Sequence, residues 1–356
     1  MLDMEIIKAA PKVELHDHLD GGLRPTTIIE LADNYGIQLP AKQPEEISKW
    51  IHQGADRKNL ALYLEGFAVT VSLMQWKEAL VRVAREALID RAEENIVYAE
   101  IRFAPSLHTG NGLSTEQVVE SVLEGLEEGS AETGIVYGLI LCAMRDKSDS
   151  LEIAKLAVSF RSHGVVGFDI AGDENGHPPS RHLEAFKYIS SKNFNITIHA
   201  GEAFGIESIW QAVQICGCHR IGHATRLLED MNITPSGAVL MGTLSQFIRD
   251  RRIPLEICIS SNIHTGAVNS VELHPFNIFY RNGFRVAICS DNRLMSNTTL
   301  TQEITLAAGI FSLTLKDIEK LTLNAMKSAF INYDQRLEII YDIIKPKYEE
   351  LRKSMI

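Results

Sequence analysis

Four runs of the sequence carry residue types that bind metals or transfer protons. Two histidines, His16 and His18, stand two positions apart inside an apolar run. Alternate residues of a strand point to the same face, so these two imidazoles would face one side. Three later apolar runs end in further candidates, namely His199 with Glu202, His223, and Asp291 with Asn292.

Three histidines and one carboxylate are a combination that binds zinc in proteins. Zn²⁺ accepts neutral imidazole nitrogen and carboxylate oxygen, and a catalytic site leaves one position for water. The set that these runs suggest is His16, His18, His199 and Asp291. A water molecule on such an ion loses its proton near neutral pH and becomes a nucleophile. Iron or cobalt would suit the same nitrogen and oxygen donors.

Each of these residues also has an ordinary structural explanation. A single histidine at the end of a strand is more often a hydrogen-bonded core or surface residue than a metal ligand, and Glu202 and His223 could be solvated loop residues. Charged groups seldom follow apolar strands without a partner or a role, however. Seven other histidines lie in expected loops or helices, and we expect them to be structural: His52, His108, His163, His177, His182, His219 and His274.

Eight β-rich apolar runs would bring the candidate residues together. They span residues 13–19, 96–104, 136–144, 165–171, 196–200, 220–224, 254–260 and 284–290. Segments with helical spacing separate or precede them, at 26–35, 60–94, 115–133, 151–162, 183–192, 206–216 and 236–251. This alternation predicts parallel βαβ units, and eight of them predict an α/β protein with a closed (β/α)8 TIM barrel. Active sites of such barrels lie at the carboxyl ends of the strands, where the candidates fall.

An open doubly wound sheet is the structural alternative. No glycine-rich phosphate loop follows the first strand, which weakens the nucleotide-binding version of that fold. Residues 24–94 are far longer than an ordinary crossover, so we expect extra helices over the C-terminal mouth of the barrel. Helices at 315–331 and 336–353 should close the chain. The sequence shows no interdomain linker and no internal repeat, so residues 1–356 are predicted to form one metal-dependent hydrolase barrel domain.

The composition excludes several classes of protein. The 356 residues carry 35 basic and 46 acidic side chains, a net charge of −11, which disfavours binding to nucleic acid or to an anionic membrane surface. No apolar run reaches the 18 residues of a membrane-spanning helix, and residues 1–12 lack the apolar core of a signal peptide. The five cysteines predict buried thiols and a cytoplasmic location. A metal pair at Cys216 and Cys218 would need a second cysteine pair, which the sequence lacks.

Five motifs together resemble those of the adenosine deaminases. They are VELHDHLDG at 13–21, DIAGDE at 169–174, HAGE at 199–202, RIGHA at 220–224 and ICSDN at 288–292. The likeness extends from about residue 11 to residue 299, with the motifs in the family's order and spacing. This is the metal-dependent adenosine/AMP deaminase family of the amidohydrolase superfamily.

The resemblance implies roles for the residues that match. One zinc ion per chain would be held by His16, His18, His199 and Asp291. Glu202 would be the general acid that protonates N1 of the purine, and this chemistry needs a carboxylic acid that stays neutral near pH 7. His223 would orient the zinc-bound water and help accept its proton.

The resemblance also places the nucleoside. His18 would contact the substrate, Asp20 would reach the ribose, and the Gly172 N–H would contact purine N3. Asn292 departs from the second aspartate of well-studied members. An asparagine amide can donate to purine N7 without any pKa shift, so we count Asn292 as a variation rather than a loss.

An apolar lid is the least specific part of the resemblance. Tyr63, Leu64 and Phe67 fall where adenosine deaminases cover the nucleoside, although their spacing fits one face of a core helix equally well.

The implied reaction is hydrolytic deamination of adenosine to inosine and ammonia, and of 2′-deoxyadenosine to 2′-deoxyinosine and ammonia, as in purine salvage. The same chemistry on another 6-aminopurine is the alternative: adenine, an N6-substituted nucleotide or aminodeoxyfutalosine. A catalytically silent binder would have lost a ligand or the general acid, and all of these residues are present. No Arg/Lys cluster lies near the motifs, which favours a nucleoside over AMP. The oligomeric state is left open.

Overall fold

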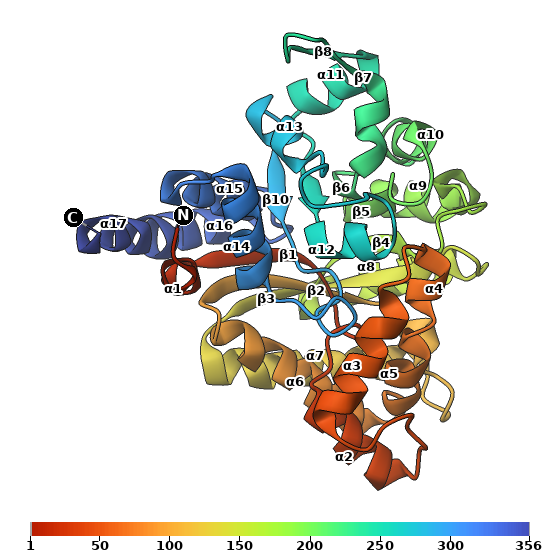
Figure 1. The fold of residues 1–356 in the computed structure, drawn as a ribbon. Helices are drawn as coiled ribbons and strands as arrows, with labels where there is room; N and C mark the ends of the chain where they lie inside the picture. The colour runs from red at the N-terminus through yellow and green to blue at the C-terminus, as the bar shows by residue number, and fades with distance from the viewer. Residues whose placement is uncertain (1, 356) are drawn as a thin grey trace.

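Eight parallel strands form the barrel at the centre of the structure, a computed structural model that describes residues 2–355 (Figure 1). They are β1 (Lys12–His18), β2 (Ile96–Phe103), β3 (Val136–Met144), β4 (Val165–Ala171), β5 (Asn195–Ala200), β6 (Arg220–His223), β9 (Leu255–Ile257) and β10 (Val286–Ile288). The strand order follows the chain. The barrel closes where the Asp291 N–H donates to the His16 carbonyl and the His18 N–H donates to the Asp291 carbonyl, both at 2.8 Å. The predicted TIM barrel is confirmed, and the open sheet is excluded.

Helices surround the strands in the expected alternation. Those between and after the strands are α6 (Lys77–Ala92), α7 (Thr115–Thr133), α8 (Ser150–Ser159), α9 (Leu183–Ser191), α10 (Ile206–Trp210), α11 (Thr243–Asp250), α12 (Ile259–His264), α13 (Phe276–Arg281), α14 (Leu300–Phe311) and α15 (Leu315–Ser328). α7 begins where its sequence predicts, because Ser114 and Gln117 form a capping box that satisfies free N–H groups of the first turn.

The long segment after β1 adds helices beside the barrel mouth, as predicted. It contains α2 (Pro25–Tyr35), α3 (Pro44–Ala55), α4 (Leu60–Leu64) and α5 (Phe67–Leu73). The expected helical stretch 60–94 is therefore three helices, α4, α5 and α6, with breaks at 65–66 and 74–76. α4 and α5 supply side chains to the cavity at the mouth of the barrel.

The predicted helix at 236–251 is wrong in its first half. Two short strands form an antiparallel hairpin there, β7 (Met231–Ile233) and β8 (Val239–Met241). Pro235 and Gly237 favour the turn between these strands, and Gly237 has the left-handed φ of +81°. α11 begins only at Thr243, because the Asp230 carboxylate accepts a hydrogen bond from the Ser245 N–H in its first turn.

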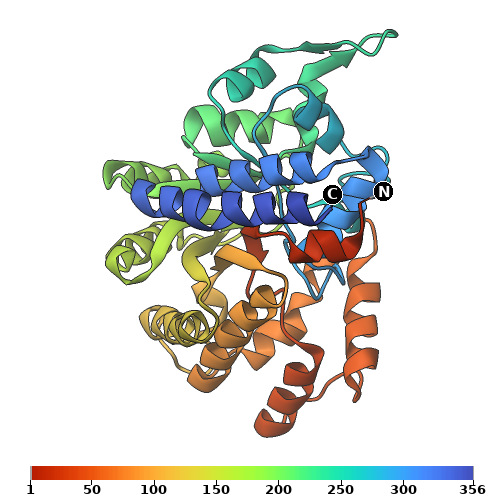
Figure 2. The same ribbon diagram turned by 90° about the vertical axis from the view of Figure 1, so that its left-hand side faces the viewer.

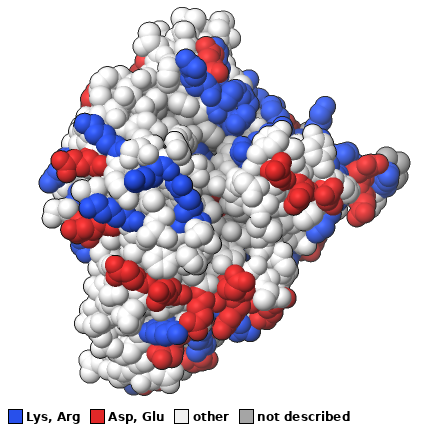
Figure 3. Space-filling view, turned by 180° about the vertical axis from the view of Figure 1, so that it is seen from behind, with Lys and Arg blue, Asp and Glu red and all other residues white. Residues whose placement is uncertain are grey.

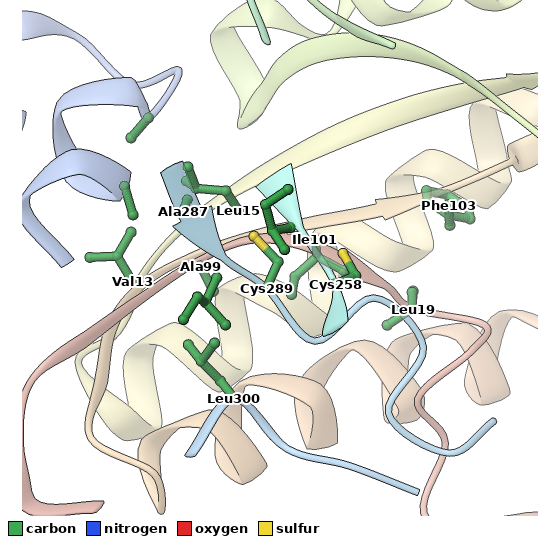
Figure 4. Close-up of a cluster of buried hydrophobic side chains, with 14 of the residues drawn as sticks. Val13, Leu15, Leu19, Ala99, Ile101, Phe103, Cys258, Ala287, Cys289 and Leu300 are labelled. Carbon is green, nitrogen blue, oxygen red and sulfur yellow. The ribbon is translucent and has the colours of Figure 1, made fainter. Parts of the chain in front are cut away.

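Alternation along the strands divides the barrel into an apolar outside and a polar lumen. Val13 and Leu15 of β1 belong to a buried apolar cluster with Ile101 of β2 and Leu300 of α14, shown in Figure 4. The residues that alternate with these apolar ones point into the barrel and are polar. They include His16 of β1 and Arg102 of β2. This arrangement seals one face of each strand with helices and leaves the other face for chemistry.

The two ends of the chain lie together at one side of the barrel (Figure 2). The last helices are α16 (Tyr333–Glu338) and α17 (Lys345–Ser354), joined by a π-helical turn. The Tyr348 hydroxyl of α17 donates a hydrogen bond of 3.1 Å to the Pro11 carbonyl, just before β1 begins. Lys12 donates to three backbone carbonyls around α1 (Met4–Ala9) and so ties that helix to the same end.

Neither a membrane span nor a continuous basic stripe stands out. Within residues 2–355, the helices are all too short or too polar to cross a bilayer. On the face shown in Figure 3, acidic side chains gather along the lower half. Basic side chains are more frequent over the upper half of the same face.

The packing of α7 on α6 yields a prediction about stability. A Cβ added at Gly125 would overlap the Val81 carbonyl, which is backbone and cannot rotate away. We expect Gly125→Ala to lower the free energy of unfolding by about 1–3 kcal/mol, as overpacking does. Gly54→Ala in α3 is the matched control, because a Cβ there meets no atom within 4 Å and should stabilise by about 0.5–1 kcal/mol. Urea unfolding measures both, and an unchanged or raised stability of Gly125→Ala would contradict this packing.

Candidate active site

A cavity of about 290 Å³ opens at the carboxyl ends of the strands. The sequence-predicted residues that line it come from β1, β5, β6, the loops after β1, β4, β5 and β10, and the helices α4 and α5: His18, Asp20, Gly172, His199, Glu202, His223, Asp291, Asn292, Tyr63, Leu64 and Phe67. His16 lies just beneath the cavity and is fully buried. The structure thus brings every predicted site residue to one place, while their individual roles stay predictions.

Four donor atoms converge at the floor of this cavity. The Nε2 atom of His199 lies 3.0 Å from Nε2 of His16 and 3.1 Å from Nε2 of His18. Oδ1 of Asp291 lies 3.3 Å from Nε2 of His16 and 3.4 Å from Nε2 of His18. Four donors placed tetrahedrally at about 2.0–2.1 Å from one ion lie about 3.3 Å from one another. These four distances are those expected between ligands of a single zinc-sized ion.

Carboxylates behind the imidazoles determine which nitrogen faces the centre. Nδ1 of His16 lies 2.8 Å from Oε2 of Glu256, and Nδ1 of His199 lies 2.9 Å from Oδ2 of Asp169. A neutral imidazole that donates through Nδ1 leaves its Nε2 lone pair free. These lone pairs point at each other across about 3 Å, an arrangement that a cation between them stabilises.

Arg102 lies between these two carboxylates. Its guanidinium contacts Asp169 at 2.7 Å and Glu256 at 2.9 Å, and all three side chains are fully buried. Although burial raises it, contact with His199 and Arg102 holds the pKa of Asp169 below its usual range. Sequence reasoning assigned no role to Arg102, Asp169 or Glu256. The available signal was a charged residue inside an otherwise apolar strand.

A second grouping shares three of these ligands. His16, His199, His223 and Asp291 have donor atoms that all lie within 4.8 Å of one another. His18 is not part of this grouping, but its Nε2 lies within 3.4 Å of both His199 and Asp291. The distances favour His18 as the fourth ligand and leave His223 beside the ion position.

The backbone is strained at two of these positions. His223 has φ of +66° and Asp291 has φ of +63°, a left-handed conformation that is uncommon for side-chain-bearing residues. Such a conformation costs about 1–3 kcal/mol and occurs mostly where surrounding structure over-determines it. His223 ends β6 and Asp291 follows β10, and both residues line the cavity.

Glu202 occupies the wall beside the ligand cluster. Its Oε2 lies 3.5 Å from Nε2 of His223, and its Oε1 accepts a hydrogen bond of 3.0 Å from the Thr265 hydroxyl. Burial, with the neighbouring charges of Asp291 and Glu174, raises the pKa of Glu202 to about 8. The side chain is therefore a carboxylic acid near pH 7 and can donate a proton.

Glu174 fixes the turn that carries Glu202. Its carboxylate accepts hydrogen bonds from four successive backbone N–H groups, those of Gly201, Glu202, Ala203 and Phe204. The motif DIAGDE contained this residue, but nothing in the sequence indicated which loop it would hold.

The outer part of the cavity is apolar with few polar groups. Tyr63 is buried, and its hydroxyl lies 3.0 Å from Oγ of Ser296. Oδ1 of Asp20 is buried without a hydrogen-bond partner and faces a cavity that Asp20 lines. Among the described residues that line this cavity there is no lysine or arginine. Arg24 is paired with Asp90, and Arg102 is occupied in the lumen.

Comparisons with known proteins show which families and folds the chain resembles. The family model described as Adenosine deaminase matches residues 11–346. "Adenosine deaminase 1" of Streptomyces coelicolor is 50% identical over 356 residues, which cover 98% of this chain and 90% of that protein. Arabidopsis ADAL complexed with IMP has a TM-score of 0.83 and 28% identity, covering 97% of this chain and 99% of that one. An amidohydrolase from Burkhoderia ambifaria with bound Zn has a TM-score of 0.85, 20% identity and coverage of 99% and 94%, which shows a shared fold.

The contact between His199 and Asp169 yields a prediction about metal affinity. Asp169→Asn removes the charge that orients His199 and raises its basicity, so we expect zinc affinity to fall by about 10–100-fold. Asp173→Asn, a partly exposed position in the loop after β4, is the control and should leave affinity unchanged. Competition against a chromophoric chelator measures both. Equal affinities of the two variants would contradict this role of Asp169.

Proposed function

The chain belongs to the adenosine deaminase family, and we propose that it catalyses the hydrolytic deamination of adenosine and 2′-deoxyadenosine, releasing ammonia. The observation that carries this proposal is the buried carboxyl group of Glu202, which faces His223 beside the convergent donor atoms of His16, His18, His199 and Asp291. An acid, a water-orienting group and a metal site are the parts that attack at C6 of a purine requires.

We further propose one zinc ion per chain, held by His16, His18, His199 and Asp291. The convergent Nε2 lone pairs and the spacing of 3.0–3.4 Å support this ligand set. A bound zinc ion would supply Lewis acidity there and would lower the pKa of a coordinated water to about 7.

The side chains around the cluster perform the other steps. Glu202 donates its proton to N1 of the purine, which makes C6 electrophilic. His223 orients the attacking water toward C6. One proton of that water passes to the departing amino group, which leaves as ammonia, and the other returns to the Glu202 carboxylate in place of the proton given to N1. The Gly172 N–H and the Asn292 amide hold the base through N3 and N7, and both residues line the cavity.

The cavity favours a nucleoside over a nucleotide. Its described lining offers Asp20 to ribose hydroxyl groups and no cation to a phosphate. A phosphate dianion buried without a cation would be strongly destabilised. Another 6-aminopurine substrate is not favoured, because the 50% identical relative is an adenosine deaminase while the relative that binds IMP is 28% identical.

The direct test of this function is turnover, followed by the ultraviolet change as adenosine is converted to inosine. We expect rapid turnover of adenosine and 2′-deoxyadenosine and little of adenine or AMP. Glu202→Gln should lower kcat by about 10²–10⁴-fold, because the amide cannot protonate N1, with zinc content unchanged. Glu207→Gln, the same change at an exposed position in α10, is the control. Turnover of AMP with adenosine untouched would contradict the proposal, as would full activity of Glu202→Gln.

The raised pKa of Glu202 gives the reaction a definite pH dependence. The protonated form is the active one, so kcat/KM should fall as pH rises through the pKa of about 8. Well above that pKa the loss should be about tenfold per pH unit. The residual kcat/KM of Glu202→Gln should not show this fall at high pH. A kcat/KM that keeps rising above pH 9 would contradict the role of Glu202 as an acid.

A further inference from the structure

Three buried side chains form a hydrogen-bonded chain that ends at His223. The backbone N–H of Phe276 donates to Nδ1 of His274 at 3.1 Å. Nε2 of His274 lies 3.2 Å from Oδ1 of Asn262, and Nδ2 of Asn262 lies 2.9 Å from Nδ1 of His223. The other ring nitrogen of His223, Nε2, faces Oε2 of Glu202 at 3.5 Å. Asn262, His274 and His223 are all at most 2% exposed.

The direction of every hydrogen bond in this chain follows from its first member. A backbone N–H can only donate, so Nδ1 of His274 accepts and carries no proton. Burial lowers the pKa of His274 to about 3, so its ring is neutral near pH 7. The one ring proton is then on Nε2 and is donated to Oδ1 of Asn262. The amide nitrogen of Asn262 consequently donates to Nδ1 of His223.

The oxygen and nitrogen of an asparagine side chain can often be exchanged without a change of shape, but the neighbours of Asn262 allow only one orientation. Exchange at Asn262 would place its NH2 group against the Nε2–H of His274, so that two donors would face each other. Moving the proton of His274 to Nδ1 would create the same conflict with the Phe276 N–H. Only one arrangement satisfies all three buried groups.

We propose that His274 and Asn262 are positioning residues that fix His223 in the tautomer with its proton on Nε2, facing the cavity. The proposal deepens the proposed function and rests on it. In this tautomer His223 orients the attacking water by donating a hydrogen bond to its oxygen. It has no free lone pair on Nε2, so it neither takes the proton of that water through this atom nor serves as a metal ligand there.

This tautomer distinguishes the two possible ligand sets. A metal bound to Nε2 of His223 would require a proton on Nδ1, which would oppose the amide donor of Asn262 at 2.9 Å. His18 has no such constraint, because its Nε2 faces His199 and Asp291. The hydrogen-bonded chain and the interatomic distances thus select the same set.

The tautomer can be read directly from the zinc-loaded wild-type protein. Long-range ¹H–¹⁵N spectra of histidine-labelled protein separate protonated from unprotonated ring nitrogens, and His223→Gln identifies the His223 signals by their loss. We expect a proton on Nε2 of His223 and none on Nδ1. A proton on Nδ1 would overturn the proposal. This measurement does not depend on activity, so it remains decisive if the wild-type enzyme fails to deaminate adenosine, a result that would contradict the proposed function instead.

Asn262→Asp tests the catalytic consequence. An aspartate accepts from both neighbours, so it should keep the bond from His274 and draw the proton of His223 to Nδ1. We expect kcat to fall by about 10²–10⁴-fold with KM little changed, because the imidazole then has the wrong tautomer. Asn269→Asp is the control, since it adds the same charge at an exposed position in the loop that follows α12. A moved proton with unchanged kcat would overturn the positioning role, and if the variant does not fold, the wild-type spectrum alone decides.

Discussion

The site depends on three charges buried in the lumen of the barrel. Arg102 lies between Asp169 and Glu256, and those two carboxylates hold Nδ1 of His199 and His16. Removing one partner of such a buried set leaves an uncompensated charge and costs about 3–5 kcal/mol. The imidazole lone pairs therefore converge because strands β2, β4 and β9 present their charges to β1 and β5. Catalytic geometry and stability rest on the same contacts.

The site also depends on closure of the barrel, which places Asp291 beside the histidines of β1. β10 joins β1 through the backbone of Asp291, so the carboxylate that completes the ligand cluster lies at the seam itself. The left-handed backbone of Asp291 and His223 turns both side chains inward at a cost that the closed barrel sustains. Glu174 fixes the position of Glu202, because its carboxylate accepts hydrogen bonds from four N–H groups of the turn that carries Glu202. Asp291 and Glu202 are thus each held in place by residues of another strand or loop.

The sequence predicted the parts of the structure that depend on local pattern. Apolar runs located all eight barrel strands, and polar residues at their ends located His18, His199, Glu202 and Asp291 in one cavity. Partners far apart in the chain were not predictable, because the contact of Arg102 with Glu256 depends on a register that no local spacing specifies. His274 was expected to be structural, and only its contact with Asn262 shows its link to His223. The β7–β8 hairpin was missed because its turn residues were outweighed by an apparent helical spacing.

The central claim is that the four convergent donor atoms bind one metal ion and that His223 does not. Anomalous diffraction at the zinc edge, from crystals of protein purified without added metal, tests this most directly. The account predicts one peak per chain, about 2.0–2.1 Å from the Nε2 atoms of His16, His18 and His199 and from an Asp291 carboxylate oxygen. A peak bonded to Nε2 of His223 in place of His18, or no peak in crystals of a protein that still deaminates adenosine, would contradict it.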